Sequence, residues 1–153
     1  MYPDICKWLE SYLNCKFVKD SKKITVLDTH ASYLSNFIIK LKYQKYFPEF
    51  STYQIQQDIT GFIEYNDKVE LVFVECKLDQ LTLSNLSQLI GYSFIAKPFI
   101  SILLSPKGMS NSLERLLNVF NRRDILQYRP KRKILIIKWD IHKQDIDYMS
   151  SII

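Results

Sequence analysis

The chain has 153 residues, a formal net charge of +5 and 47% hydrophobic residues, which predicts one domain, residues 1–153, with its own core and excludes a disordered protein. Three glycines are too few for a glycine-rich phosphate loop, and no apolar run is long enough to span a membrane. Three cysteines without metal-ligand spacing, and no basic and apolar leader, predict an intracellular, cytoplasmic protein without a membrane partner.

Hydrophobic periodicity predicts the elements in chain order. Helices are expected at residues 3–14 and 31–46, the second ending before Pro48, with a short strand at 24–28 between them. A hairpin follows, with strands at 53–64 and 69–78 around a turn at Tyr65–Lys68. The remaining elements are expected to be a helix at 82–96, a strand at 99–104, a helix at 112–121 capped by Asn111 or Ser112, a strand at 134–139 and a short helix within 143–153. This order predicts an α/β fold with a mixed central sheet flanked by helices.

The strand at 69–78 is apolar on both alternating faces for most of its length, which is typical of a central strand covered on both sides. Glu75 and Lys77 leave the end of this strand on the same face, whereas Cys76 points to the other face and is expected in the core. Charges at such a position are costly unless they are paired or bound to a metal.

The hairpin is expected to bring Asp58 close to Glu75 and Lys77. A symmetric turn centred on Asn66 and Asp67 places Asp58 directly opposite Glu75, although a one-residue bulge near Gly61 would break this register. Two carboxylates at that separation repel each other, and a divalent cation between them removes the conflict.

The resulting pattern, Asp-x16-Glu-x-Lys, resembles the PD-(D/E)xK nuclease superfamily. Gln57 stands where the family usually has proline. The resemblance covers residues 56–106, and Gln88 with Tyr92 is similar to the pattern of the archaeal Holliday-junction-resolvase-like branch. It implies a restriction-endonuclease-like αβββαβ core, with the helix at 31–46 as an insertion or addition near its start.

The resemblance also implies a catalytic centre. Mg²⁺ or Mn²⁺ would be held by Asp58, Glu75 and the main-chain carbonyl of Cys76, with Lys77 beside the attacking water and the phosphate. Gln88 would support Lys77 or the water. Glu10, on the first helix, is a candidate further metal ligand, but a solvated helix glutamate is the favoured interpretation. Family members are often homodimers, so a homodimer is expected.

A basic stretch near the C-terminus is the second functional signal. Six cations lie within twelve residues, namely Arg122, Arg123, Arg129, Lys131, Arg132 and Lys133. A solvated loop and a nucleic-acid-binding surface both remain open, and the nuclease motif favours phosphate contact. His30 and His142 are expected to be ordinary surface or turn residues.

The leading hypothesis is a divalent-metal-dependent nuclease that hydrolyses phosphodiester bonds, with DNA as the expected partner and endonucleolytic cleavage as the expected reaction. The alternatives are a non-catalytic nucleic-acid-binding module with a relict nuclease site, and a structural subunit. Metal-dependent cleavage separates the first hypothesis from both alternatives.

Overall fold

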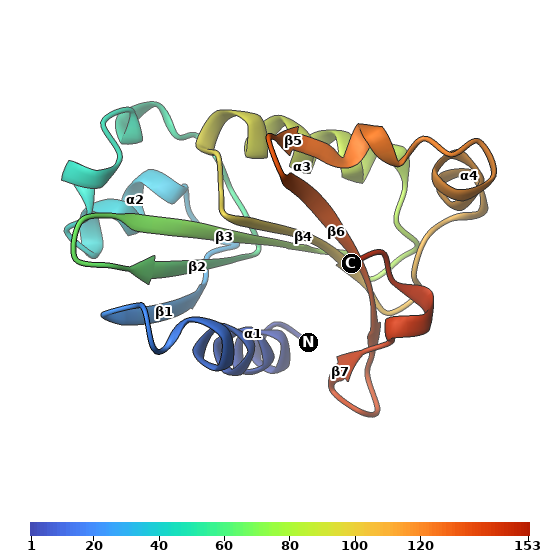
Figure 1. Ribbon diagram of the computed structural model, residues 1–153, viewed down its shortest axis with the longest axis horizontal. Coiled ribbons are helices and arrows are strands. Elements are labelled where there is room, and N and C mark those ends of the chain that lie inside the picture. Colours follow the sequence, from blue (N-terminus) through green and yellow to red (C-terminus); the bar gives the residue numbers. More distant parts are fainter. The chain divides into compact units, whose positions relative to one another are not determined.

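Seven β-strands and four α-helices make up the computed structural model, which describes residues 1–153. The strands are β1 (Lys23–Asp28), β2 (Ile59–Glu64), β3 (Val69–Cys76), β4 (Ile100–Ser105), β5 (Gln127–Arg129), β6 (Arg132–Asp140) and β7 (Asp145–Ile146). The α-helices are α1 (Tyr2–Phe17), α2 (Leu34–Lys40), α3 (Leu83–Ala96) and α4 (Asn111–Glu114). The strands are hydrogen-bonded in the order β1-β2-β3-β4-β6-β5, with β7 paired to β6 (Figure 1). The predicted α/β class with a mixed sheet is confirmed.

The chain forms two compact units, Met1–Phe73 and Val74–Ile153. In the first unit, β1 and β2 pair in antiparallel fashion from Lys23↔Glu64 to Asp28↔Ile59, and α1 packs against both strands (Figure 1). A Cβ at Gly61 would lie 3.2 Å from Leu13 Cδ1 of the helix and 3.1 Å from Val72 Cβ. Glycine at this position therefore lets the helix and the neighbouring strand approach β2 closely.

The segment between β1 and β2 differs from the prediction. The expected helix at 31–46 is only α2, followed by single 3-10 turns at Gln44–Tyr46 and Phe50–Thr52. Its early end is set by Lys42, which has φ of 60° in the left-handed region and cannot continue a right-handed helix. Residues 53–57 are not strand either. Here the carbonyl of Ile55 accepts a hydrogen bond from the Leu34 amide at 2.7 Å, which ties this segment to the start of α2.

The hairpin turn forms as predicted. Tyr65 N donates to Lys68 O at 2.8 Å, which is the pairing expected for a turn centred on Asn66 and Asp67. Every residue of β3 except the half-buried Glu70 is buried, so the prediction of a strand covered on both faces is confirmed. Cys76 is also buried, as expected.

In the second unit, β4 and β6 run parallel from Ser101↔Ile134 to Ser105↔Lys138, and α3 packs against β4 and β5. The helix starts with a capping box between Thr82 and Asn85 and ends at Lys97, whose φ of 52° is left-handed. The predictions for α3, β4 and β6 are confirmed to within two residues at each end.

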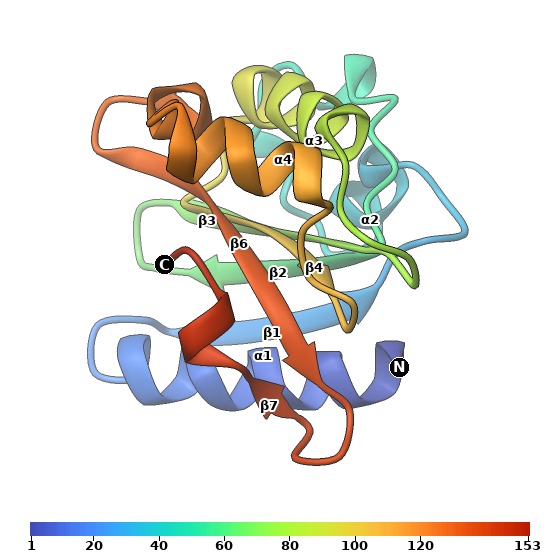
Figure 2. The ribbon, with the colours of Figure 1, turned by 90° about the vertical axis from the view of Figure 1, so that its right-hand side faces the viewer.

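Two predictions for the C-terminal part are wrong. The first concerns a cap: the helix expected at 112–121 forms, as α4 continued by a π-helical turn over Arg115–Val119, but it is capped by Ser110 rather than by Asn111 or Ser112. The tail is not a helix. It forms β7, makes a single 3-10 turn at Tyr148–Ser150 and then returns along β6 (Figure 2). There the Ile136 and Ile152 amides donate to each other's carbonyls at 2.9 and 2.8 Å. Pairing with β6 satisfies backbone groups that a short terminal helix would leave exposed. No helix in the structure is both long and apolar enough to cross a membrane.

Candidate functional site

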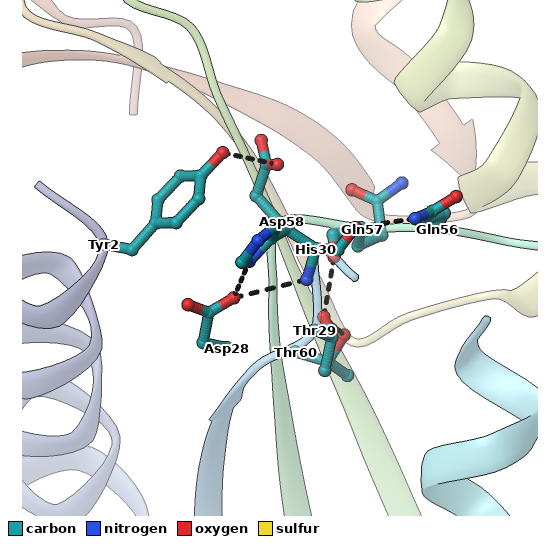
Figure 3. Close-up of polar contacts among 8 residues, drawn as sticks. All are labelled: Tyr2, Asp28, Thr29, His30, Gln56, Gln57, Asp58 and Thr60. Atoms are coloured by element: carbon teal, nitrogen blue, oxygen red, sulfur yellow. Dashed lines mark hydrogen bonds and ion pairs between the residues drawn. The ribbon is translucent and has the colours of Figure 1, made fainter. Parts of the chain in front are cut away.

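Asp58 lies at a bend directly before β2, in the first unit. Its carbonyl accepts a hydrogen bond from the Thr29 amide at 2.9 Å, which extends the β1–β2 pairing by one residue. Its carboxylate Oδ1 accepts a hydrogen bond from the Tyr2 hydroxyl at 2.8 Å (Figure 3). The first turn of α1 and the start of β2 therefore position this carboxylate together.

A histidine and a second carboxylate lie in the same cluster. His30 Nδ1 is 2.5 Å from Asp28 Oδ1, and the His30 amide donates to the same oxygen at 3.3 Å. The His30 ring centroid is 5.3 Å from that of Tyr2. Figure 3 shows Asp28, His30, Tyr2 and Asp58 gathered beside the first turn of α1.

Sequence reasoning did not assign a role to His30. The sequence signal for this contact is the spacing Asp28-x-His30 at the end of β1. Residues two apart at the end of a strand can direct their side chains to the same side. About half of the His30 side chain (52%) is exposed, so this imidazole is accessible to solvent and to a ligand.

Gln57 is the unusual residue of the cluster. It is only 2% exposed, and neither polar atom of its side-chain amide has a hydrogen-bond partner. Its carbonyl accepts from Thr29 Oγ1 at 2.7 Å, and Thr29 Oγ1 also lies 2.9 Å from Thr60 Oγ1 (Figure 3). A buried polar group without a partner costs about 1–3 kcal/mol. An amide kept at this cost can hydrogen-bond a ligand or an ordered water.

The Cys6 thiol on α1 lies near the Asp28 and Glu10 carboxylates. Burial is the main cause that raises the pKa of the Cys6 thiol to about 11, and the Asp28 and Glu10 carboxylates raise it further. The thiol is therefore protonated at neutral pH, which excludes Cys6 as a reactive nucleophile. Glu10 itself is exposed on α1, as expected for a solvated helix glutamate.

The second unit holds the other two residues of the predicted motif. Glu75 is 4% exposed, and Lys77 Nζ donates to Glu75 Oε1 at 2.6 Å. The Lys77 amide donates to Leu104 O at 2.8 Å, which fixes the end of β3 beside β4. The prediction that Glu75 and Lys77 leave the strand on one face agrees with this ion pair. Gln88, the predicted supporting residue, is exposed on α3.

The basic stretch is only partly a loop. It contains a 3-10 turn at Arg123–Leu126, all of β5 and the start of β6. Arg122 forms a bidentate ion pair with Asp124, in which Nε donates to Oδ1 at 2.9 Å and Nη2 donates to Oδ2 at 3.1 Å. Arg123 donates two hydrogen bonds to the neutral Asn118 Oδ1, at 3.2 and 2.7 Å.

The second half of the stretch divides into packed and exposed cations. Arg129 Nη1 donates to Lys97 O at 2.7 Å, and the Arg132 guanidinium lies 3.7 Å from the ring centroid of Phe99. Lys131 and Lys133 are exposed. The six predicted cations therefore differ in how available they are for a phosphate.

No protein-family model, curated protein or solved structure matches the chain. The family resemblance thus rests on the residues of the motif alone. No group of three or more His, Cys, Asp or Glu side chains lies close enough together to ligate a metal ion.

Proposed function

We propose that the protein is a divalent-metal-dependent nuclease with a restriction-endonuclease-like core, which cleaves phosphodiester bonds of DNA endonucleolytically. The order of elements supports this proposal. The chain runs α1, β1, β2, β3, α3, β4, which agrees with the αβββαβ order, and α2 with its two 3-10 turns is an insertion between β1 and β2.

The observation that carries the proposal is the buried Glu75 at the end of an apolar strand. Burying a carboxylate costs several kcal/mol, and an ion pair often does not recover that cost. Apolar side chains could end β3 at no such cost. Glu75 and Lys77 are therefore better explained by chemistry than by stability.

The donor groups suit Mg²⁺ or Mn²⁺. Asp58, Glu75 and the Cys76 carbonyl would supply oxygen ligands, which these hard cations prefer. Tyr2 contacts one oxygen of Asp58, and Lys77 contacts one oxygen of Glu75. A carboxylate has two oxygens with about four lone-pair sites, so these bonds are compatible with metal ligation. The proposal requires that Asp58 of the first unit and Glu75 of the second hold the same cation.

A bound cation would lower the pKa of a water molecule and stabilise negative charge on the phosphate. The Lys77 ammonium would neutralise charge that develops on the phosphate oxygens in the transition state, and it would orient the attacking water. Gln88 would support Lys77, as the family resemblance implies. The exposed Lys131 and Lys133 would contact the DNA backbone.

A non-catalytic nucleic-acid-binding or structural protein with a relict site is the second candidate. The 2.6 Å Lys77–Glu75 ion pair favours it, because this pair neutralises both charges without a metal. Salt-sensitive DNA binding without metal-dependent cleavage is the behaviour expected of a binding module.

Plasmid cleavage in Mg²⁺, Mn²⁺ and a chelator tests the proposal. Wild-type protein should cut DNA only with a metal, and Asp58→Asn and Glu75→Gln should each abolish cleavage. Glu70→Gln is the matched control, because Glu70 lies on β3 but pairs with Lys68 at the hairpin turn. Absence of cleavage by the wild type, or normal cleavage by both site variants, contradicts the proposal.

A further inference from the structure

A polar pocket of about 360 Å³ lies in the second unit, and none of the proposed catalytic residues lines it. It is formed by the loop after β4, the turns that follow α4, strand β6 and the C-terminal segment. Three cationic side chains from three separate segments line it: Lys107, Arg123 and Lys138. One carboxylate, Glu114, also lines it.

Each cation is held in place by a neighbour. Arg123 is held by two hydrogen bonds to Asn118, which also lines the pocket. Because Asn118 is neutral, it orients the guanidinium without neutralising its charge. An oriented, uncompensated guanidinium is suited to bind a phosphate through two parallel hydrogen bonds.

Lys138 is positioned by a glycine. Gly108 has φ of 69°, and a Cβ at this residue would lie 3.3 Å from Lys138 Cδ. The alkyl chain of Lys138 therefore packs against the backbone of the loop after β4, and the residue lines the pocket. Its only ion-pair partner is Asp147, at 3.7 Å.

Lys107 is the most loosely held cation. It pairs with Asp79 at 2.6 Å, but both side chains are largely exposed. Exposed ion pairs are weak and screened by salt, so an incoming anion can compete with Asp79 for this ammonium. Neither Asp79 nor Asp147 lines the pocket, which leaves Glu114 as its only acid.

From this arrangement we infer that the pocket binds a phosphate group, held by Arg123 with Lys138 and Lys107. The inference goes beyond the proposed cleavage site, because none of Asp58, Glu75 and Lys77 lines the pocket. Its volume is within the range of small-molecule sites, so it accommodates a phosphate together with the group that carries it. That group is either a nucleotide of a nucleic acid strand or a free phosphorylated molecule.

Inorganic phosphate is the first probe. In a titration of ¹⁵N-labelled protein at constant ionic strength, phosphate should shift the amide signals of Gly108, Asn118 and Ser151 in a saturable manner. Arg123→Gln should weaken binding about tenfold, as expected for loss of a charged hydrogen bond. Glu114→Gln should strengthen it severalfold, because it removes the only carboxylate in the lining.

Arg122→Gln is the matched control. Arg122 is adjacent in sequence but pairs with Asp124 and does not line the pocket, so phosphate binding should not change. Equal effects of the Arg122 and Arg123 substitutions, or no saturable shifts at the pocket, would overturn the inference. The spectra themselves report whether each variant is folded.

A second arm identifies what carries the phosphate. If a DNA oligonucleotide displaces inorganic phosphate from the pocket, the site takes a phosphate of nucleic acid. If adenosine monophosphate displaces it and DNA does not, the site takes a free nucleotide. Both outcomes support a phosphate site, and neither depends on cleavage, so this inference and the proposed nuclease activity can fail separately.

Discussion

The Tyr2 hydroxyl donates a 2.8 Å hydrogen bond to Asp58 Oδ1, which joins the first turn of α1 to the residue before β2. The two residues are 56 positions apart in the chain. The ring of the same tyrosine lies against His30, which pairs with Asp28. One aromatic side chain thus connects both carboxylates of the cluster in the first unit.

Tyr2→Phe should lower the free energy of unfolding by about 1 kcal/mol, because it removes one hydrogen bond to a carboxylate and preserves the ring. If Asp58 ligates a metal, calorimetric titration with Mn²⁺ should also show weaker binding. Tyr33→Phe, which alters an exposed tyrosine of the same unit, is the control and should change neither quantity. Identical behaviour of the two variants would show that the Tyr2 hydroxyl does not position Asp58.

Gln57→Met should raise the free energy of unfolding by about 1–3 kcal/mol, because it replaces a buried amide without partners by an apolar side chain of similar length. Gln56→Met is the comparison. Gln56 is exposed and donates to His30 O at 2.6 Å, so its replacement should not stabilise the protein. Chemical denaturation measures both effects. A destabilised Gln57→Met protein would mean that the amide has a structural partner.

The double variant Lys131→Gln/Lys133→Gln should weaken DNA binding for all sequences alike. Its melting temperature should be unchanged, because both side chains are exposed. The slope of log K against log salt should become shallower by up to about one per lost phosphate contact. Arg132→Gln should instead lower the melting temperature, since it removes the contact with the Phe99 ring. An unchanged salt slope for the double lysine variant would show that the pair does not contact the backbone.

The Cys6 thiol should make stability decrease at alkaline pH. Its pKa of about 11 in the folded protein is higher than the value of about 8.5 for a free cysteine. The folded state thus holds this proton more tightly, and the resulting stability is fully present below about pH 8.5 and is lost as the pH rises to about 11.

Urea denaturation between pH 8 and 11 measures this loss, which should be smaller in Cys6→Ala. At pH 8 a thiol reagent should modify the exposed Cys15 and spare Cys6. Equal reaction rates at the two cysteines would contradict the raised pKa and the burial of Cys6.

Elements with a clear hydrophobic period were predictable from sequence. Helices α1 and α3 and strands β3, β4 and β6 bury the residues that their own periodicity selects, so their local pattern and their packing agree. The misplaced elements depend on features that periodicity does not encode. Lys42 ends α2 by entering the left-handed region, and the tail is drawn into pairing with Ile136 of β6.

The candidate site also has one part that the sequence predicts and another part that it does not. Strand alternation alone placed Glu75 and Lys77 on one face, and they form an ion pair. The Tyr2–Asp58 contact could not be predicted, because it depends on how α1 packs against β1 and β2. The partners of the cations in the basic stretch, such as Asn118 for Arg123 and Phe99 for Arg132, lie outside the stretch, so the stretch alone does not reveal them.

The turnover of Lys77→Met most directly tests whether the Glu75–Lys77 pair is catalytic. Methionine preserves the stem of the side chain and removes the ammonium. If Lys77 acts in the transition state, kcat per folded protein should fall on the order of a hundredfold or more, about 3 kcal/mol, while DNA affinity in Ca²⁺ changes little. Near-normal cleavage by the folded Lys77→Met protein would contradict the nuclease mechanism and favour the binding module.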